Sequence, residues 1–161
     1  MQKLARTITF DGSDAEIFAR AAEAGEWAIP GGFEFSDWTE AELTGKAKQA
    51  FSNGWLSVES FGRCTLVAVA AIDEAELDAA TEALAAHFVA YYGAPDLNAA
   101  RGAAREEIAF MTELCADHDP NTLLVVSREL TEAGVRESFS AIQPHAADIG
   151  QVAVHGSLDD D

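Results

Sequence analysis

Four arginines are the residues whose type and spacing best suggest a binding site. Arg101 and Arg105 lie one helical turn apart in a segment with helical periodicity. Arg128 and Arg136 lie in a predicted hairpin that follows this segment. Guanidinium groups bind carboxylates and phosphates through paired hydrogen bonds. If these residues share one face, they form a cationic spot that receives an acidic side chain, a carboxylate ligand or an acidic segment of a partner protein.

The charges of the helical segment run against its own dipole, which is a second reason to examine its arginines. The basic residues occupy its early turns, whereas Glu113 and Asp117 lie in its last turns. A helix dipole favours the opposite order, although each misplaced charge costs only about a few tenths of a kcal/mol. Chance therefore explains the order as well as a binding role does. For the hairpin arginines, internal ion pairs with Glu129 or Glu137 are the competing interpretation.

Two further groups of residues have the composition of a metal site but lack its spacing. Cys115 and His118 lie three positions apart, and Cys64 would have to join them, yet structural zinc needs four ligands. A buried Cys115 and a solvated His118 are expected instead. Several glutamates of the long helices have the composition of a carboxylate-bridged metal bundle: Glu82, Glu106, Glu107 and Glu113. Such bundles need Glu-x-x-His pairs, which neither helix contains, so no metal and no cofactor is predicted.

No catalytic signature accompanies these residues. The glycine-rich phosphate loops, the Gly-x-Ser-x-Gly elbow and the His-Glu-x-x-His zinc motif are all absent from the sequence. Ser57 and Ser60 have no identifiable His-acid pair, so nucleophilic catalysis has no support. His87 is expected at the surface or boundary near the end of its helix, where a basic group favours the dipole. No catalytic residue is therefore predicted.

The composition indicates a soluble acidic protein. The chain has 28 Asp and Glu residues against 10 Lys and Arg residues, and its formal net charge is −18. Such a surface repels nucleic acid and anionic membranes, which leaves another protein as the expected partner. No apolar run approaches the ~20 residues of a membrane span. Residues 1–6 lack the apolar core of a signal peptide, so we expect a cytoplasmic location and reduced, buried cysteines.

Three helices are predicted, and two of them organise the chain. Residues 39–52 begin with a capping box formed by Thr39 and Glu42. The two long helices lie between Ile72 and His118 and are joined at residues 93–96. Their expected buried faces are Leu77, Leu84, Phe88 and Tyr91 in the first, and Ala104, Ile108, Met111 and Cys115 in the second. With a four-residue joint, they are expected to form an antiparallel pair across a sheet.

Short extended segments surround these helices. Strands are predicted where apolar residues alternate or run together: residues 4–10, 17–22, 27–35, 55–60, 64–72, 123–130 and 135–142. The run 64–72 is nearly all apolar and predicts a central strand. Trp55 is expected in the core. The sequence therefore predicts a single α+β domain over residues 1–143, a mostly antiparallel sheet with about three helices packed on it, and a loosely ordered acidic tail over residues 144–161.

Several short stretches also resemble a small family of uncharacterised, mainly alphaproteobacterial proteins with no assigned activity. These stretches are GEWAIPG at 25–31, LTGKA at 43–47, ESFG at 59–62, GAPD at 93–96, EEIAF at 106–110 and RESF at 136–139. The resemblance covers about residues 3–143 and carries no functional residues. It implies an accessory role, because the family is associated with gene clusters for redox enzymes and their maturation proteins.

Two functions therefore stay open. The first is a non-catalytic protein-binding or accessory factor, with a homodimer as one form of assembly. The second is an enzyme or small-ligand-binding protein with a pocket between sheet and helices. A closed interface between sheet and helices would favour the first function. A concave pocket of several hundred Å³ with a few converging polar groups would favour the second.

Overall fold

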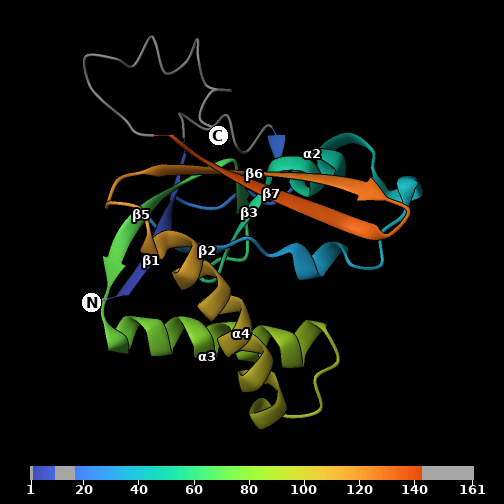
Figure 1. Cartoon of the computed structure of the whole chain (residues 1–161). Helices are drawn as coiled ribbons and strands as arrows, with labels where there is room; N and C mark the ends of the chain where they lie inside the picture. The colour runs from blue at the N-terminus through green and yellow to red at the C-terminus, as the bar shows by residue number, and fades with distance from the viewer. Residues whose placement is uncertain (1, 10–16, 143–161) are drawn as a thin grey trace.

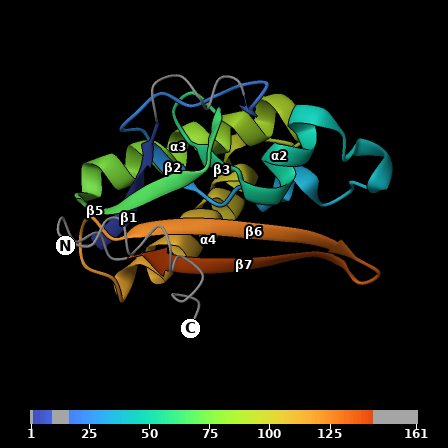
Figure 2. The same cartoon turned by 90° about the horizontal axis from the view of Figure 1, so that it is seen from above.

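One antiparallel sheet runs through the part of the chain that the computed structural model describes, residues 2–9 and 17–142. Its strands are β1 (Gln2–Ile8), β2 (Trp27–Ile29), β3 (Trp55–Ser57), β4 (Arg63–Cys64), β5 (Leu66–Ile72), β6 (Leu123–Thr131) and β7 (Gly134–Ile142). Within the described residues they form a seven-stranded sheet in the order β4-β3-β2-β1-β5-β6-β7. The predicted single α+β domain with a mostly antiparallel sheet is confirmed (Figures 1 and 2).

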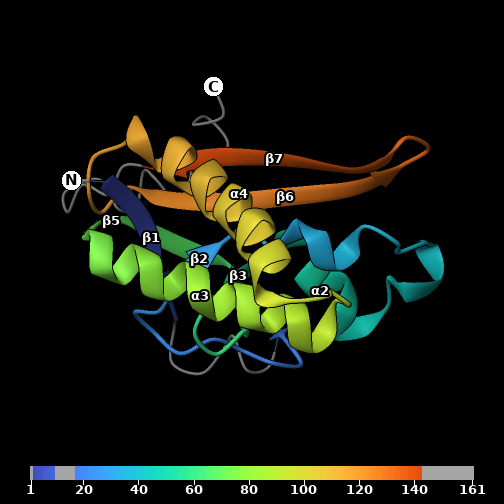
Figure 3. The same cartoon turned by 90° about the horizontal axis from the view of Figure 1, so that it is seen from below.

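The helices are inserted between these strands. They are the 3-10 turns η1 (Gly32–Phe35) and η2 (Glu40–Glu42), and the α-helices α2 (Gly45–Asn53), α3 (Glu74–Tyr91) and α4 (Leu97–Ala116). The backbone N–H of Glu76 donates to Asp73 over 2.8 Å, which satisfies an otherwise unpaired amide at the start of α3. The long helices α3 and α4 lie on the same side of the strands and cross obliquely (Figures 1 and 3).

The predicted helix over residues 39–52 is divided in two. The capping box of Thr39 and Glu42 forms as predicted, but it caps the short turn η2. Thr44 is extended and Gly45 has a φ of 56°, so the chain leaves the helical conformation before α2 begins. Glycine adopts this left-handed conformation without a steric penalty, which explains the break at this position.

The segment 17–22 is not the predicted strand paired with β1. Ala21 instead forms an isolated parallel bridge with Arg63. The N–H of Ala22 donates to the carbonyl of Arg63 over 2.9 Å, and the N–H of Arg63 donates to the carbonyl of Arg20 over 2.8 Å. These hydrogen bonds satisfy the segment's backbone beside β4. The predicted loosely ordered tail over residues 144–161 lies outside the described residues.

The strands around β5 form where the sequence predicts them. β5 lies between β1 and β6, and its Val67 and Val69 are buried on one face while small alanines occupy the other. The predicted hairpin is formed by β6 and β7, with Thr131 paired to Gly134 at its turn. Both predictions, the central strand and the hairpin, are therefore confirmed.

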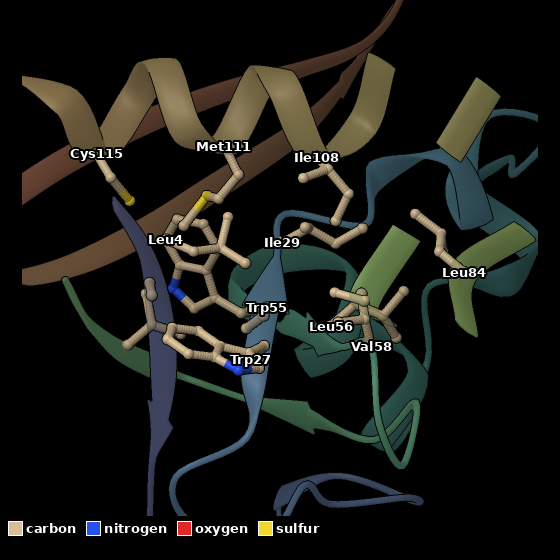
Figure 4. Packing of buried hydrophobic residues seen from close by; sticks show 14 of the residues in the cluster. Leu4, Trp27, Ile29, Trp55, Leu56, Val58, Leu84, Ile108, Met111 and Cys115 are labelled. Atoms are coloured by element: carbon tan, nitrogen blue, oxygen red, sulfur yellow. The ribbon is translucent and has the colours of Figure 1, made fainter. Parts of the chain in front are cut away.

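The core lies between the sheet and the two long helices. Ile108, Met111 and Cys115 point from α4 toward Leu4 and Ile29 (Figure 4), and all five are buried. Burial of each large apolar side chain contributes roughly 1.5–3 kcal/mol. Trp55 is fully buried, as predicted.

The end of α3 departs from the predicted buried face. Leu84 and Phe88 are buried, but Tyr91 is 75% exposed. Tyr91 lies in the last turn of the helix, and its ring contacts His87 at a centroid distance of 5.0 Å. Among the described residues, no helix is long and apolar enough to cross a membrane.

Candidate functional site

The four arginines singled out in the sequence occupy separate environments. Arg101 and Arg105 line a groove of about 680 Å³ between α3 and α4. Arg101 donates to both carboxylate oxygens of Glu82, over 2.7 and 3.2 Å, which ties α4 to α3. The helix pair therefore carries one paired arginine and the exposed Arg105.

The hairpin arginines do not join them. Arg136 is exposed and donates to Glu129 over 2.6 Å across the hairpin. Arg128 is buried and donates to Glu137 over 2.7 Å. These are the internal ion pairs that the sequence offered as the competing interpretation, and the buried Arg128 cannot be part of an exposed cationic spot. Arg101 and Arg105 stay the predicted contact for an acidic partner.

Arg128 belongs instead to a buried arginine cluster, formed by Arg63 and Arg128 around the ring of Phe35. The guanidinium carbons lie 4.6 and 5.0 Å from the ring centroid, so both cations lie within cation–π range of the aromatic ring. Each arginine is only 5% exposed. Glu34 pairs with Arg63, and Glu137 pairs with Arg128.

The buried arginine cluster binds two segments of backbone, the end of α2 and the loop before η1. Arg128 Nη1 donates to Phe51 O and Gly54 O, both over 2.9 Å, at the end of α2. Arg63 donates to the same Gly54 oxygen and to the carbonyl of Gly31, each over 3.0 Å. Burial and then the neighbouring Arg63 lower the pKa of Arg128 to about 10, so Arg128 stays charged at neutral pH. Burial also lowers the pKa of Arg63, and Glu34 opposes that shift. The cluster closes the end of α2 and holds η1 in place.

A cavity opens on the outer side of this cluster. It has a volume of about 420 Å³, and we call it the aromatic pocket. Its aromatic lining comes from the segment 17–22, from η1 and the loop after it, from the β3–β4 turn and from the end of α3: Phe18, Phe35, Trp38, Phe61, His87, Tyr91 and Tyr92. Its charged lining is Arg20, Glu34, Lys46 and Arg63. Cavities of this size with mainly apolar walls and a few polar groups are typical of small-molecule sites.

Phe61 forms part of this wall in a strained conformation. Its φ is 60°, the left-handed region, which is unfavourable for a bulky side chain by roughly 1–2 kcal/mol. Its ring stacks on His87, with centroids 3.8 Å apart and planes 3° apart. Strain of this kind persists only where surrounding contacts fix it, and it concentrates at binding sites.

The turn around Phe61 shows how the strain is maintained. Ser57 Oγ accepts the N–H groups of Glu59 over 2.9 Å and of Ser60 over 3.1 Å. A Cβ on Gly62 would approach the Ala21 backbone to 2.5 Å, so only glycine allows this close contact. The neighbouring segments therefore fix the turn and present the Phe61 ring to the pocket.

Three polar groups of the pocket influence one another. Burial lowers the pKa of His87, Glu34 opposes that shift, and Arg20 adds to it. Burial raises the pKa of Tyr92, and the charge of Glu34 raises it further. His87 and Tyr92 are consequently uncharged at neutral pH. They can donate or accept hydrogen bonds beside the Glu34 side chain.

A second cavity, of about 530 Å³, is acidic. Glu106, Glu107 and Glu137 line it together with the exposed Phe110. Burial, and then Glu137 and Glu106, raise the pKa of Glu107. Within residues 2–9 and 17–142, no group of three or more potential ligands is arranged to hold a metal ion.

The cysteine environment differs from that of a reactive site. Cys64 and Cys115 are buried, and neither forms a disulfide. Burial raises the pKa of Cys115 to about 12, so its thiol stays protonated and unreactive at neutral pH. Lys3 donates to the backbone carbonyl of His118 over 2.7 Å, which ties β1 to the turn after α4.

Sequence reasoning missed most of the aromatic pocket. The sequence showed clustered aromatic residues, including Phe35 and Trp38, in the first third of the chain, but not the groups that join them from the end of α3. Arg63 lies between Gly62 and the apolar run 64–72, a position that indicates only a turn. An arginine directly before an apolar strand was the available signal, because a charge there needs buried partners.

Comparison with known proteins gives a family but no activity. A family of unknown function (DUF6505) matches residues 1–160, and the chain belongs to it. The match extends beyond residue 143, where the resemblance based on short stretches ended. No curated protein and no solved structure matches the chain significantly.

Proposed function

We propose that the protein binds a small, flat molecule in the aromatic pocket. The observation that carries this proposal is the Phe61 ring, which is kept at a φ of 60° and stacked on His87 at the wall of a cavity of about 420 Å³. A glycine or asparagine would suit that backbone better. A strained phenylalanine is explained by what its ring contacts, and its ring lines the pocket.

The pocket also has the chemistry of a binding site. Aromatic side chains supply stacking surfaces, and Glu34, His87 and Tyr92 supply hydrogen-bonding groups in a partly desolvated setting. No nucleophile with an adjacent base lines the cavity among the described residues, so the arrangement supports binding rather than a covalent reaction.

The test uses planar aromatic fragments (indole, benzamide and quinoline) and the melting temperature of the full chain. Ligands that bind the native state and not the unfolded chain raise the melting temperature, and the shift grows with the logarithm of the ligand concentration once that exceeds the Kd. Ala47 of α2 lines the pocket and is half-buried, so Ala47→Trp should fill the cavity and abolish the shift. Ala103→Trp, at an exposed position of α4, is the matched control and should leave the shift unchanged. Equal shifts in both variants would contradict the proposal.

A second candidate function is that of a protein-binding accessory factor. Among the described residues, the large apolar side chains left exposed all lie on or next to α3 and α4: Val89, Tyr91, Tyr92, Leu97 and Phe110. Exposed apolar side chains of this kind favour contact with another protein, and a homodimer would use the same surface. Sedimentation of the purified chain tests the homodimer. A monomer at every concentration rules it out.

A further inference from the structure

The stacking surfaces of the aromatic pocket define the shape of its ligand. Phe61 and His87 offer one stacked pair, and Tyr91 and Tyr92 extend it at the end of α3. Trp38 also lines the cavity and stacks on Phe51 with an interplanar angle of 14°. The aromatic side chains of the lining favour a flat ring, because they offer stacking surfaces.

Glu34 defines one edge of that ring. Within the described residues, the hydrogen bond that its carboxylate accepts comes from Arg63, at Oε1. A carboxylate has lone pairs for about four hydrogen bonds, and the Glu34 side chain is 40% exposed where it lines the cavity. The remaining acceptor capacity fits a ligand edge that presents N–H donors. An edge that presents ring acceptors would be repelled.

The other charged residues of the pocket define a third feature of the ligand, an anionic group. Arg20 and Lys46 are exposed and line the cavity together with Arg63 and Glu34, so cations outnumber carboxylates in the described part of its lining. This is unusual on a chain with a formal net charge of −18. A positive cleft on an acidic protein concentrates the field on a small anion while the rest of the surface repels anionic polymers.

Resting on the proposed function, we propose that the ligand is a fused heteroaromatic anion. Its ring carries an N–H beside an amino group, which face Glu34, and its anionic group reaches Arg20. Guanine nucleotides and pterin carboxylates share this chemistry. Stacking, donor edge and anionic group are each assigned to a different part of the pocket, so each can be tested separately.

Isothermal titration calorimetry with related probes tests the three features on the full chain. Guanosine monophosphate should bind at least about tenfold more tightly than adenosine monophosphate, because adenine directs a ring acceptor at Glu34. Inosine monophosphate, which lacks the amino group, should fall between them. Guanosine, which lacks the phosphate, should bind at least about fivefold more weakly than guanosine monophosphate. Pterin-6-carboxylate distinguishes the two ligand classes, guanine nucleotides and pterin carboxylates. It keeps the ring edge with an N–H beside an amino group and carries a carboxylate in place of the phosphate.

Two variants assign the effects to residues. Arg20→Gln should weaken the binding of guanosine monophosphate at least about threefold and leave the binding of guanosine unchanged. Arg136→Gln removes the same charge at an exposed position outside the pocket and should change neither of these two affinities. Glu34→Gln should reduce the preference for guanine over adenine. If its melting temperature drops, the Arg20 and nucleotide comparisons still decide the question.

The outcomes separate the ligand class from the proposed function. If the planar fragments bind in the pocket but the nucleotides show no preference for guanine or phosphate, the ligand class is wrong and the pocket is still a binding site. If neither fragments nor nucleotides bind, both proposals fail. Guanine-selective, phosphate-dependent binding that Arg20→Gln weakens supports the class.

Discussion

The buried arginine cluster and the aromatic pocket share Arg63, but they use polar groups in opposite ways. In the cluster, Arg63 and Arg128 direct their donors to backbone carbonyls and to Glu34 and Glu137. In the pocket, His87, Tyr92 and the outer part of Glu34 line open space. One region completes its hydrogen bonds within the fold, whereas the other presents donors and acceptors to a cavity.

This difference separates structural from binding roles more reliably than residue type does. The sequence pointed to arginines because of their charge, yet Arg128 is enclosed by the end of α2 and the loop at Pro30. Burial of two like charges is tolerated only with full hydrogen bonding. The pocket instead combines half-buried rings with backbone strain at Phe61. No single residue type in the sequence indicates either feature.

The largest effect is expected from removal of Arg128. Arg128→Met leaves Glu137 without its buried partner and strips hydrogen bonds from Phe51 O and Gly54 O. The free energy of unfolding should fall by roughly 3–5 kcal/mol, measured by urea denaturation. Arg136→Gln breaks an exposed ion pair and should cost less than about 1 kcal/mol. Equal losses in the two variants would remove the distinction between buried and exposed arginines.

A smaller effect should isolate the strain in the pocket. Phe61→Ala and Phe61→Gly both remove the ring that stacks on His87. Glycine accepts a φ of 60° freely, so Phe61→Gly should be more stable than Phe61→Ala by about 1 kcal/mol in urea unfolding. Both variants should lose fragment binding. If alanine is as stable as glycine, the backbone at Phe61 is not strained and the main support for the pocket weakens.

The fold was largely predictable because its signals are local. The capping box at Asp73 and the apolar spacing of Ala104, Ile108 and Met111 each depend on residues within a few turns of one another. The two failures have different causes. Gly45 breaks the predicted first helix locally, whereas the segment 17–22 does not form the predicted strand because its backbone pairs with Arg63, a residue far along the chain.

The candidate site was mostly unpredictable because it is assembled from distant segments. Glu34, Phe61 and His87 come from three separate elements. The sequence cannot show that Gly62 packs on the Ala21 backbone, and this contact fixes the turn that presents Phe61. What the sequence could show was the ESFG stretch at residues 59–62, whose role becomes clear only once its partners are in place.

The smallest effect concerns pH and tests whether His87 belongs to the pocket's electrostatics. Its ordinary pKa is 6.5 and the fold lowers it, so the unfolded chain binds a proton more readily than the folded chain. Stability attributable to the neutral imidazole is therefore complete above pH 6.5 and is lost as the pH falls below that value. The difference in unfolding free energy between wild type and His87→Asn should be constant above about pH 7.5 and shrink toward about pH 5. Because Arg20 contributes to the lowered pKa while Glu34 opposes it, the same comparison in an Arg20→Gln background should show a weaker pH dependence. A difference that stays flat down to about pH 5 would mean that His87 titrates alike in both states, and the contrast between a closed cluster and an electrostatically coupled pocket would then rest on geometry alone.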